Sequence, residues 1–263
     1  MKPGIIYPLM IVIASSSYGI LSTIVKLAMK NGFASSEAVT SQYLFGFLLA
    51  FILVLVTQRT LPSIQLKGWI TLLFAGIFTA TTKRLPTKIE AISLVFLFTG
   101  TILAAGVLDV DLTSIPWQGW AFGLAAALSF SIFIQINARQ VTGVTTITRT
   151  FIVSAIALIV ISIFLSPEII WNGQLSAGLW KYGLALGLFG VILPIMLFSF
   201  AIPKVGGGLA SILSAMELPV AILASVIVLH ETLTALQFFG IVLVLIGMTL
   251  PPYLSMRKTK QKT

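Results

Sequence analysis

The sequence has no cysteine, one histidine and few charged residues, and each scarcity excludes a class of protein. Without cysteine there is no disulfide framework and no thiolate metal site, and a single histidine cannot build a metal cluster. Charged residues make up 9% of the 263 positions, whereas a soluble domain normally carries about 25%. A water-soluble fold of this length could not cover its surface with so few charges.

Several catalytic signatures are also absent. There is no G-x-x-x-x-G-K-[ST] phosphate loop, no H-E-x-x-H, no G-x-S-x-G and no Cys/His pair. We therefore expect no ATP motor, no enzyme activity, no metal and no cofactor. The net charge of +9 does not indicate nucleic acid, because the basic residues sit in short loops and in the tail, where they mark topology beside anionic lipid.

Hydrophobic residues make up 58% of the chain and fall into nine apolar windows. The windows are 3–25, 38–58, 68–82, 91–108, 112–138, 150–167, 182–203, 205–230 and 232–256. A span needs about 20 apolar residues, and backbone amides in lipid must pair within a helix. The pattern predicts an all-α integral membrane protein with nine helical segments. The first window is longer than a typical signal-peptide core, so we expect a retained helix.

Two stretches of the sequence repeat. "HETLTALQFFGIVLVLIGMTL" (His230 to Leu250) aligns with "KRLPTKIEAISLVFLFTGTIL" (Lys83 to Leu103), with Gly247 on Gly100 at an offset of 147. "KYGLALGLFGVI" aligns with "KGWITLLFAGIF", with Lys181 on Lys67 at an offset of 114. The offsets differ by 33, the number of residues that the first copy lacks. The sequence thus predicts repeats over 1–108 and 112–256, followed by a basic tail over 257–263.

Two motifs predict local structure. Thr87-x-x-Glu90 and Thr234-x-x-Gln237 match the capping box that begins a helix. Gly119-x-x-x-Gly123 and Gly183-x-x-x-Gly187 permit close contact between helices.

The third window has only 15 residues, or roughly 22 Å of helix, which is short for a span. If it does not cross and the N-terminus is cytoplasmic, all but three of the 16 basic residues lie inside, as the positive-inside rule favours. If all nine windows cross, the N-terminus lies outside. Both arrangements place the C-terminal tail in the cytoplasm, and we favour the first.

The chain resembles the EamA-type transporters of the drug/metabolite transporter superfamily over nearly its whole length. The resemblance rests on the two-copy layout, on "LSAMELPVAILASVIVLHETLTALQFFGIVLVLIGMTL" (Leu213 to Leu250), and on Tyr18-Gly19 with Lys26. It implies ten helices in two inverted five-helix repeats around a central cavity, both termini cytoplasmic. It also implies transport of small metabolites or drugs, often outward.

The 33 missing residues depart from this pattern, because they correspond to the end of the third helix and essentially all of the fourth. The first repeat is therefore expected to be incomplete, with a short third segment and no fourth helix. Lipid, a partner chain such as a second copy in a homodimer, or collapse of the fold must fill the space.

Candidate residues for a substrate or proton pathway are few. Glu217 lies near the middle of its window, where burying a carboxylate in lipid is costly, so we expect it to face the interior of the helix bundle. It could serve as a proton site or a site for a cationic substrate, or it could be a hydrogen-bonded residue that packs helices together. Lys26 either binds an anionic substrate or extends to the lipid headgroups, and we favour the headgroup contact. The other candidates are polar or aromatic residues that either line a cavity or pack between helices: Tyr18, Gln42, Gln135 and Asn137. Pro219 and Pro194 are candidate hinges.

Three functions fit these observations. The first is a multi-pass secondary transporter in the plasma membrane that exports small metabolites, amino acids or drugs. The second is a truncated membrane protein that keeps the helices but does not transport. The third is a flippase for a lipid carrier.

Overall fold

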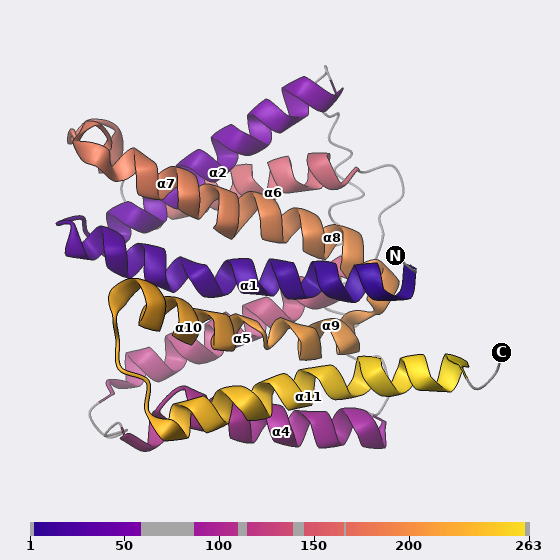
Figure 1. The fold of residues 1–263 in the computed structure, drawn as a ribbon. Coiled ribbons are helices and arrows are strands. Elements are labelled where there is room, and N and C mark those ends of the chain that lie inside the picture. The colour runs from indigo at the N-terminus through magenta and orange to yellow at the C-terminus, as the bar shows by residue number, and fades with distance from the viewer. Residues whose placement is uncertain (1–2, 59–86, 110–114, 139–144, 166, 261–263) are drawn as a thin grey trace.

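The computed structural model describes residues 3–58, 87–109, 115–138, 145–165 and 167–260. Within these ranges the chain is helical and contains no strand. The α-helices are α1 (Pro3–Lys30), α2 (Ser35–Gln58), α4 (Lys88–Ala104), α5 (Trp117–Asn137), α6 (Thr146–Phe164), α7 (Trp180–Gly187), α8 (Leu193–Val205), α9 (Gly207–Ser214), α10 (Glu217–Leu229) and α11 (Ala235–Lys260). The predicted all-α class is confirmed for this part of the chain (Figure 1).

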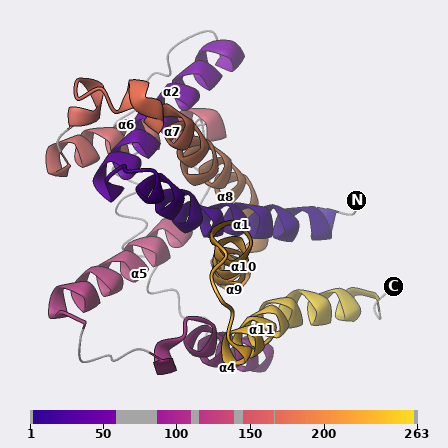
Figure 2. The ribbon, with the colours of Figure 1, turned by 60° about the vertical axis from the view of Figure 1, so that its left-hand side comes forward.

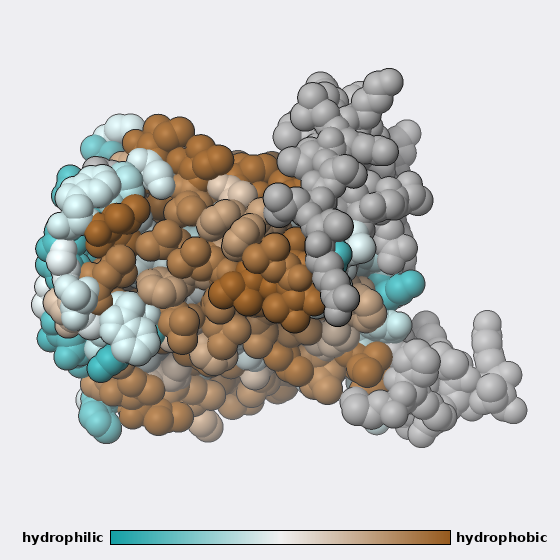
Figure 3. Space-filling model, turned by 90° about the horizontal axis from the view of Figure 1, so that it is seen from above, coloured by the Kyte–Doolittle hydropathy of each residue, from teal (hydrophilic) through white to brown (hydrophobic). Residues whose placement is uncertain are grey.

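Seven helical stretches of the described residues are long and apolar enough to cross a membrane: Ile5–Lys30, Ser35–Gln58, Trp117–Asn137, Thr146–Phe164, Leu175–Val205, Gly207–Leu229 and Ala235–Tyr253. α4, with 17 residues, is slightly shorter. These eight segments match eight of the nine predicted windows, and the window at 68–82 lies outside the described residues. Figure 3 shows an apolar side of the bundle, with hydrophilic residues gathered at the end where α1 ends and α2 begins.

Both predicted capping boxes are present. Glu90 N–H donates to Thr87 Oγ1 at 3.3 Å, and Thr87 N–H donates to Glu90 Oε2 at 2.7 Å. Thr234 and Gln237 make the same reciprocal pair at 3.0 and 3.2 Å. Each box satisfies backbone donors that a helix start leaves unpaired, so it fixes where α4 and α11 begin.

α4 and α11 lie side by side and run in opposite directions (Figures 1 and 2). A Cβ on Gly100 would lie 2.8 Å from Val244 N and 2.9 Å from Gly240 O. A Cβ on Gly247 would lie 3.0 Å from Ser93 O and 3.1 Å from Leu97 Cγ. The repeat offset of 147 relates the two sets of contacts: Gly100 corresponds to Gly247, Gly240 to Ser93, and Val244 to Leu97. The two aligned stretches therefore contact each other reciprocally.

α1 runs between α7–α8 on one side and α9–α10 on the other (Figure 1). Its buried Ile11 and Ala14 belong to the main core cluster, together with Phe198 of α8 and Leu213 of α9. Because this packing holds α1 against α10, it sets the geometry of the site described below.

The two Gly-x-x-x-Gly motifs behave differently. Gly183 and Gly187 pack against α2, where added Cβ atoms would lie 2.6 Å from the Phe45 ring and 2.6 Å from Gly46 N. Gly123 has nothing within 4 Å of an added Cβ, and Gly119 meets only Ile115 beside its own helix. The contact that the spacing permits is therefore made by α7 and not by α5 within the described chain.

Candidate functional site

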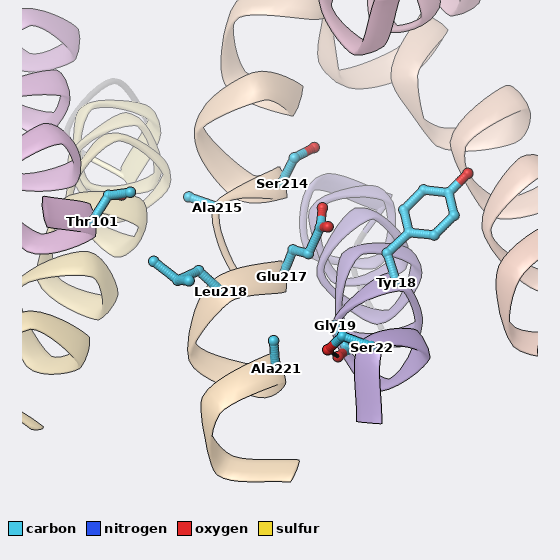
Figure 4. Close-up of a pocket in the computed structure, with 9 residues that line it drawn as sticks. All are labelled: Tyr18, Gly19, Ser22, Thr101, Ser214, Ala215, Glu217, Leu218 and Ala221. Atoms are coloured by element: carbon cyan, nitrogen blue, oxygen red, sulfur yellow. Dashed lines mark hydrogen bonds between the residues drawn. The ribbon is translucent and has the colours of Figure 1, made fainter. Parts of the chain in front are cut away.

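A cavity of about 390 Å³ lies between α1, α4 and the α9–α10 stretch (Figure 4). Its lining mixes one carboxylate, several hydroxyls and small apolar groups: Tyr18, Gly19, Ser22, Thr101, Ser214, Ala215, Glu217, Leu218 and Ala221. Its size falls in the range of small-molecule sites, about 300–1,000 Å³. Two of the six candidate pathway residues, Glu217 and Tyr18, therefore line one pocket.

Glu217 lies at a break in its span. α9 ends at Ser214 and α10 begins at Glu217, so the carboxylate belongs to the first turn of a new helix near the middle of the Gly207–Leu229 stretch. Pro219 follows two residues later and supplies no backbone donor, which maintains the break.

Gly19 brings the backbones of α1 and α10 together at this point. A Cβ added to Gly19 would lie 2.4 Å from Glu217 O and 3.0 Å from Ala221 N. Only glycine allows this approach. The close contact places Glu217 against α1, and its carboxylate points toward α1 in Figure 4.

Two of the pocket hydroxyls lie near carbonyl oxygens of their own helices. Ser214 Oγ donates to Ala210 O at 2.8 Å, and Ser22 Oγ lies 3.4 Å from Gly19 O. The Tyr18 ring packs against Phe130 and Phe198 at centroid distances of 6.3 and 5.9 Å, and its hydroxyl points away from Glu217 (Figure 4). Ser22 and Ser214 thus keep acceptor lone pairs for a ligand.

Lys26 lies outside the pocket, one helical turn beyond Ser22. Its Nζ donates to Glu231 Oε1 at 2.8 Å, and both side chains are exposed. The hydrogen bond from Lys26 lowers the pKa of Glu231 below its ordinary value. The pair ties the end of α1 to the α10–α11 loop, and a contact of Lys26 with headgroups or with an anionic substrate stays a prediction.

The three amides occupy other positions. Asn137 is buried, accepts from Ser199 Oγ at 2.9 Å and donates to Phe133 O at 2.8 Å, so it joins α5 to α8. Gln42 is buried against Gly190, and Gln135 lies beside Gly207. None of them lines the Glu217 pocket, and their role in a pathway remains a prediction.

Pro194 follows a π-helical turn, Leu188–Ile192, within the seventh predicted window. The wider turn accommodates a proline that cannot donate to the preceding turn. Ser17 Oγ of α1 donates to Phe189 O at 2.5 Å. Both candidate hinge prolines therefore sit at real irregularities in helices that contact α1.

Sequence reasoning missed Ser22, Thr101 and Ser214, because lone hydroxyls in apolar windows give no distinguishing pattern. Among the described residues, no group of three His, Cys, Asp or Glu side chains could hold a metal ion.

A scan of protein families matches residues 117–250 to the EamA-like transporter family. A search of curated proteins finds no match. The matched stretch covers about half of the chain and includes Glu217, the α9–α10 break and Gly240 and Gly247 of α11. The chain is a multi-pass membrane protein that belongs to the EamA-like transporter family.

Proposed function

We propose that the chain is a secondary transporter that carries small molecules such as metabolites, amino acids or drugs outward across the plasma membrane, with the Glu217 pocket as its binding site. One observation carries the proposal. A carboxylate lines a cavity at a break in a membrane span, and broken helices near the bilayer midplane are where secondary transporters bind their substrates.

The reciprocal contact of α4 and α11 supports an inverted repeat over 1–108 and 112–256. Equivalent residues of α4 and α11, 147 positions apart, make the same contact on the opposite helix. Because the helices are antiparallel, a two-fold axis perpendicular to both relates them. If both helices cross the bilayer, that axis lies in the membrane plane, as in transporters built from inverted repeats.

Alternating access would then arise at the seam between α1 and α10. At Gly19 the backbones of α1 and α10 are in contact, so one helix can rotate against the other there. Pro219 and the π turn before Pro194 are points at which α10 and α8 can bend. The Lys26–Glu231 pair closes one end of the same seam. Basic residues favour cytoplasmic termini on both ends of the chain.

A second function, a membrane protein that does not transport, is favoured by the 33-residue gap and by the weak packing of α5. Only Ile134 and Asn137 of α5 are buried, and Trp117, Phe122 and Leu124 are each at least 65% exposed. In the inverted repeat, the missing helix would be the counterpart of α9–α10. A homodimer is one way to cover α5.

Transport by purified protein in liposomes separates the two functions. We would measure accumulation of labelled amino acids and organic amines under an imposed proton gradient. The wild-type chain is compared with Glu217→Gln and with Glu168→Gln, which removes an exposed carboxylate outside the pocket. We expect uptake with wild type and Glu168→Gln and none with Glu217→Gln. Transport only after a 33-residue helical insert between Thr82 and Lys83 would establish the non-transporting alternative.

A further inference from the structure

The polar groups that lie nearest the Glu217 carboxylate, Ser22 and Ser214, offer a ligand hydrogen-bond acceptors. The hydroxyl proton of Ser214 points to Ala210 O at 2.8 Å, and Ser22 Oγ makes a longer contact of 3.4 Å with Gly19 O, so both oxygens keep lone pairs for a ligand. An ionised carboxylate accepts hydrogen bonds and donates none. In Figure 4 Ser214 and Ser22 lie on either side of the Glu217 carboxylate, so acceptor groups from α1, α9 and α10 gather in this part of the pocket.

No basic side chain lines the pocket among the described residues. Lys26, the nearest cation along α1, is paired with Glu231 at 2.8 Å. A ligand carboxylate would therefore meet Glu217 without a compensating charge, whereas a ligand cation would neutralise it. An unpaired charge in a membrane span is costly, so neutralisation favours binding.

Most of the remaining lining is apolar. Gly19, Ala215, Leu218 and Ala221 face the cavity, and Thr101 adds a hydroxyl from the α4 side. The volume of about 390 Å³ admits a compact hydrocarbon body and not a large polycyclic drug. An amphipathic ligand with one polar end and one apolar end matches this lining.

From these contacts we propose that the pocket selects small primary or secondary ammonium ions with an apolar body, rather than amino acids or quaternary ammonium ions. A primary ammonium donates its three N–H groups to Glu217, Ser22 and Ser214, a secondary ammonium donates its two to Glu217 and one serine, and the body lies against Leu218 and Ala221. The proposal deepens the proposed function, on which it rests for the identity of the site. A zwitterion lacks a partner for its carboxylate, and a quaternary ion has charge but no N–H to donate.

A matched set of three probes tests this directly. Phenethylamine, its N,N,N-trimethyl analogue and phenylalanine share one aromatic body and differ in N–H groups or carboxylate. Binding to detergent-purified wild-type protein is measured by calorimetry, which does not require transport. We expect phenethylamine to bind at least tenfold more tightly than the other two. Equal binding of the trimethyl analogue, or tighter binding of phenylalanine, overturns the proposal.

Variants place the effect at the pocket. Glu217→Gln should lose phenethylamine binding, Glu217→Asp should weaken it, and Glu168→Gln should leave it unchanged. Retained binding in Glu217→Gln would overturn the assignment, and the three-probe comparison in wild type holds even if a variant fails to fold. Selective binding without liposome transport refutes the proposed function alone. Transport of phenylalanine but not phenethylamine refutes the ligand class alone.

Discussion

Replacing Gly19 with alanine should separate α1 from α10 and damage the site. The added Cβ would lie 2.4 Å from Glu217 O and 3.0 Å from Ala221 N. Since the nearest atoms belong to backbone and not to flexible side-chain ends, a helix must move. Overpacking of this kind typically costs about 1–3 kcal/mol, against which alanine's better helix propensity returns about 1 kcal/mol.

The control is Gly123→Ala on α5, where nothing lies within 4 Å of the added Cβ. This variant receives the same gain in helix propensity without a clash, so its stability should equal or exceed that of wild type. We expect Gly19→Ala to unfold at a lower temperature than Gly123→Ala in detergent. We also expect it to bind phenethylamine more weakly, because Glu217 shifts with α10.

The comparison has a clear failing outcome. If Gly19→Ala and Gly123→Ala unfold at the same temperature and bind the amine equally, then α1 and α10 do not cross at Gly19. The geometry assigned to Glu217 would then be wrong.

Three further predictions concern the α4–α11 contact, the Lys26–Glu231 pair and α7. Gly100→Val and Gly247→Val should destabilise the protein by similar amounts in thermal unfolding, and a large difference would argue against a reciprocal contact. Because the pKa of Glu231 is lowered, its pairing with Lys26 contributes stability above about pH 4.3, the ordinary glutamate value, and this contribution fades as pH falls through the lowered pKa. Lys26→Met should remove that acid-side loss of stability from unfolding curves measured at different pH values. An unchanged pH profile would contradict the prediction. Gly187→Ala should unfold more easily than wild type, because its Cβ would meet Gly46 N at 2.6 Å; equal stability would argue against that contact.

Local chemistry made much of the fold predictable. A capping box involves residues three positions apart, so Thr87 and Glu90 identify a helix start without knowledge of the fold. The apolar windows likewise follow from lipid, which requires every backbone amide to pair within its own segment. The position of Glu217 in its window predicted a carboxylate that faces the interior; in the structure the side chain lines the cavity between α1, α4 and α10 and is exposed there.

Contacts between distant segments were not predictable in this way. Gly19 contacts Glu217 across nearly 200 residues of sequence, and nothing near Gly19 signals its partner. The pairing of Lys26 with Glu231 depends equally on how α1 meets the α10–α11 loop. The Gly-x-x-x-Gly spacing shows the limit of motifs, because the same pattern is packed at Gly187 and open at Gly123.

The absence of cysteine allows the most direct test of the pocket as the transport site. Ser22→Cys places one thiol in the pocket, and Ser211→Cys places one at an exposed position of α9 outside it. Both variants are treated with a small water-soluble thiol reagent, and transport in liposomes is then measured. Modification should abolish transport in Ser22→Cys, be slowed by phenethylamine, and leave Ser211→Cys active. Full transport by modified Ser22→Cys would contradict the assignment of this cavity as the substrate site.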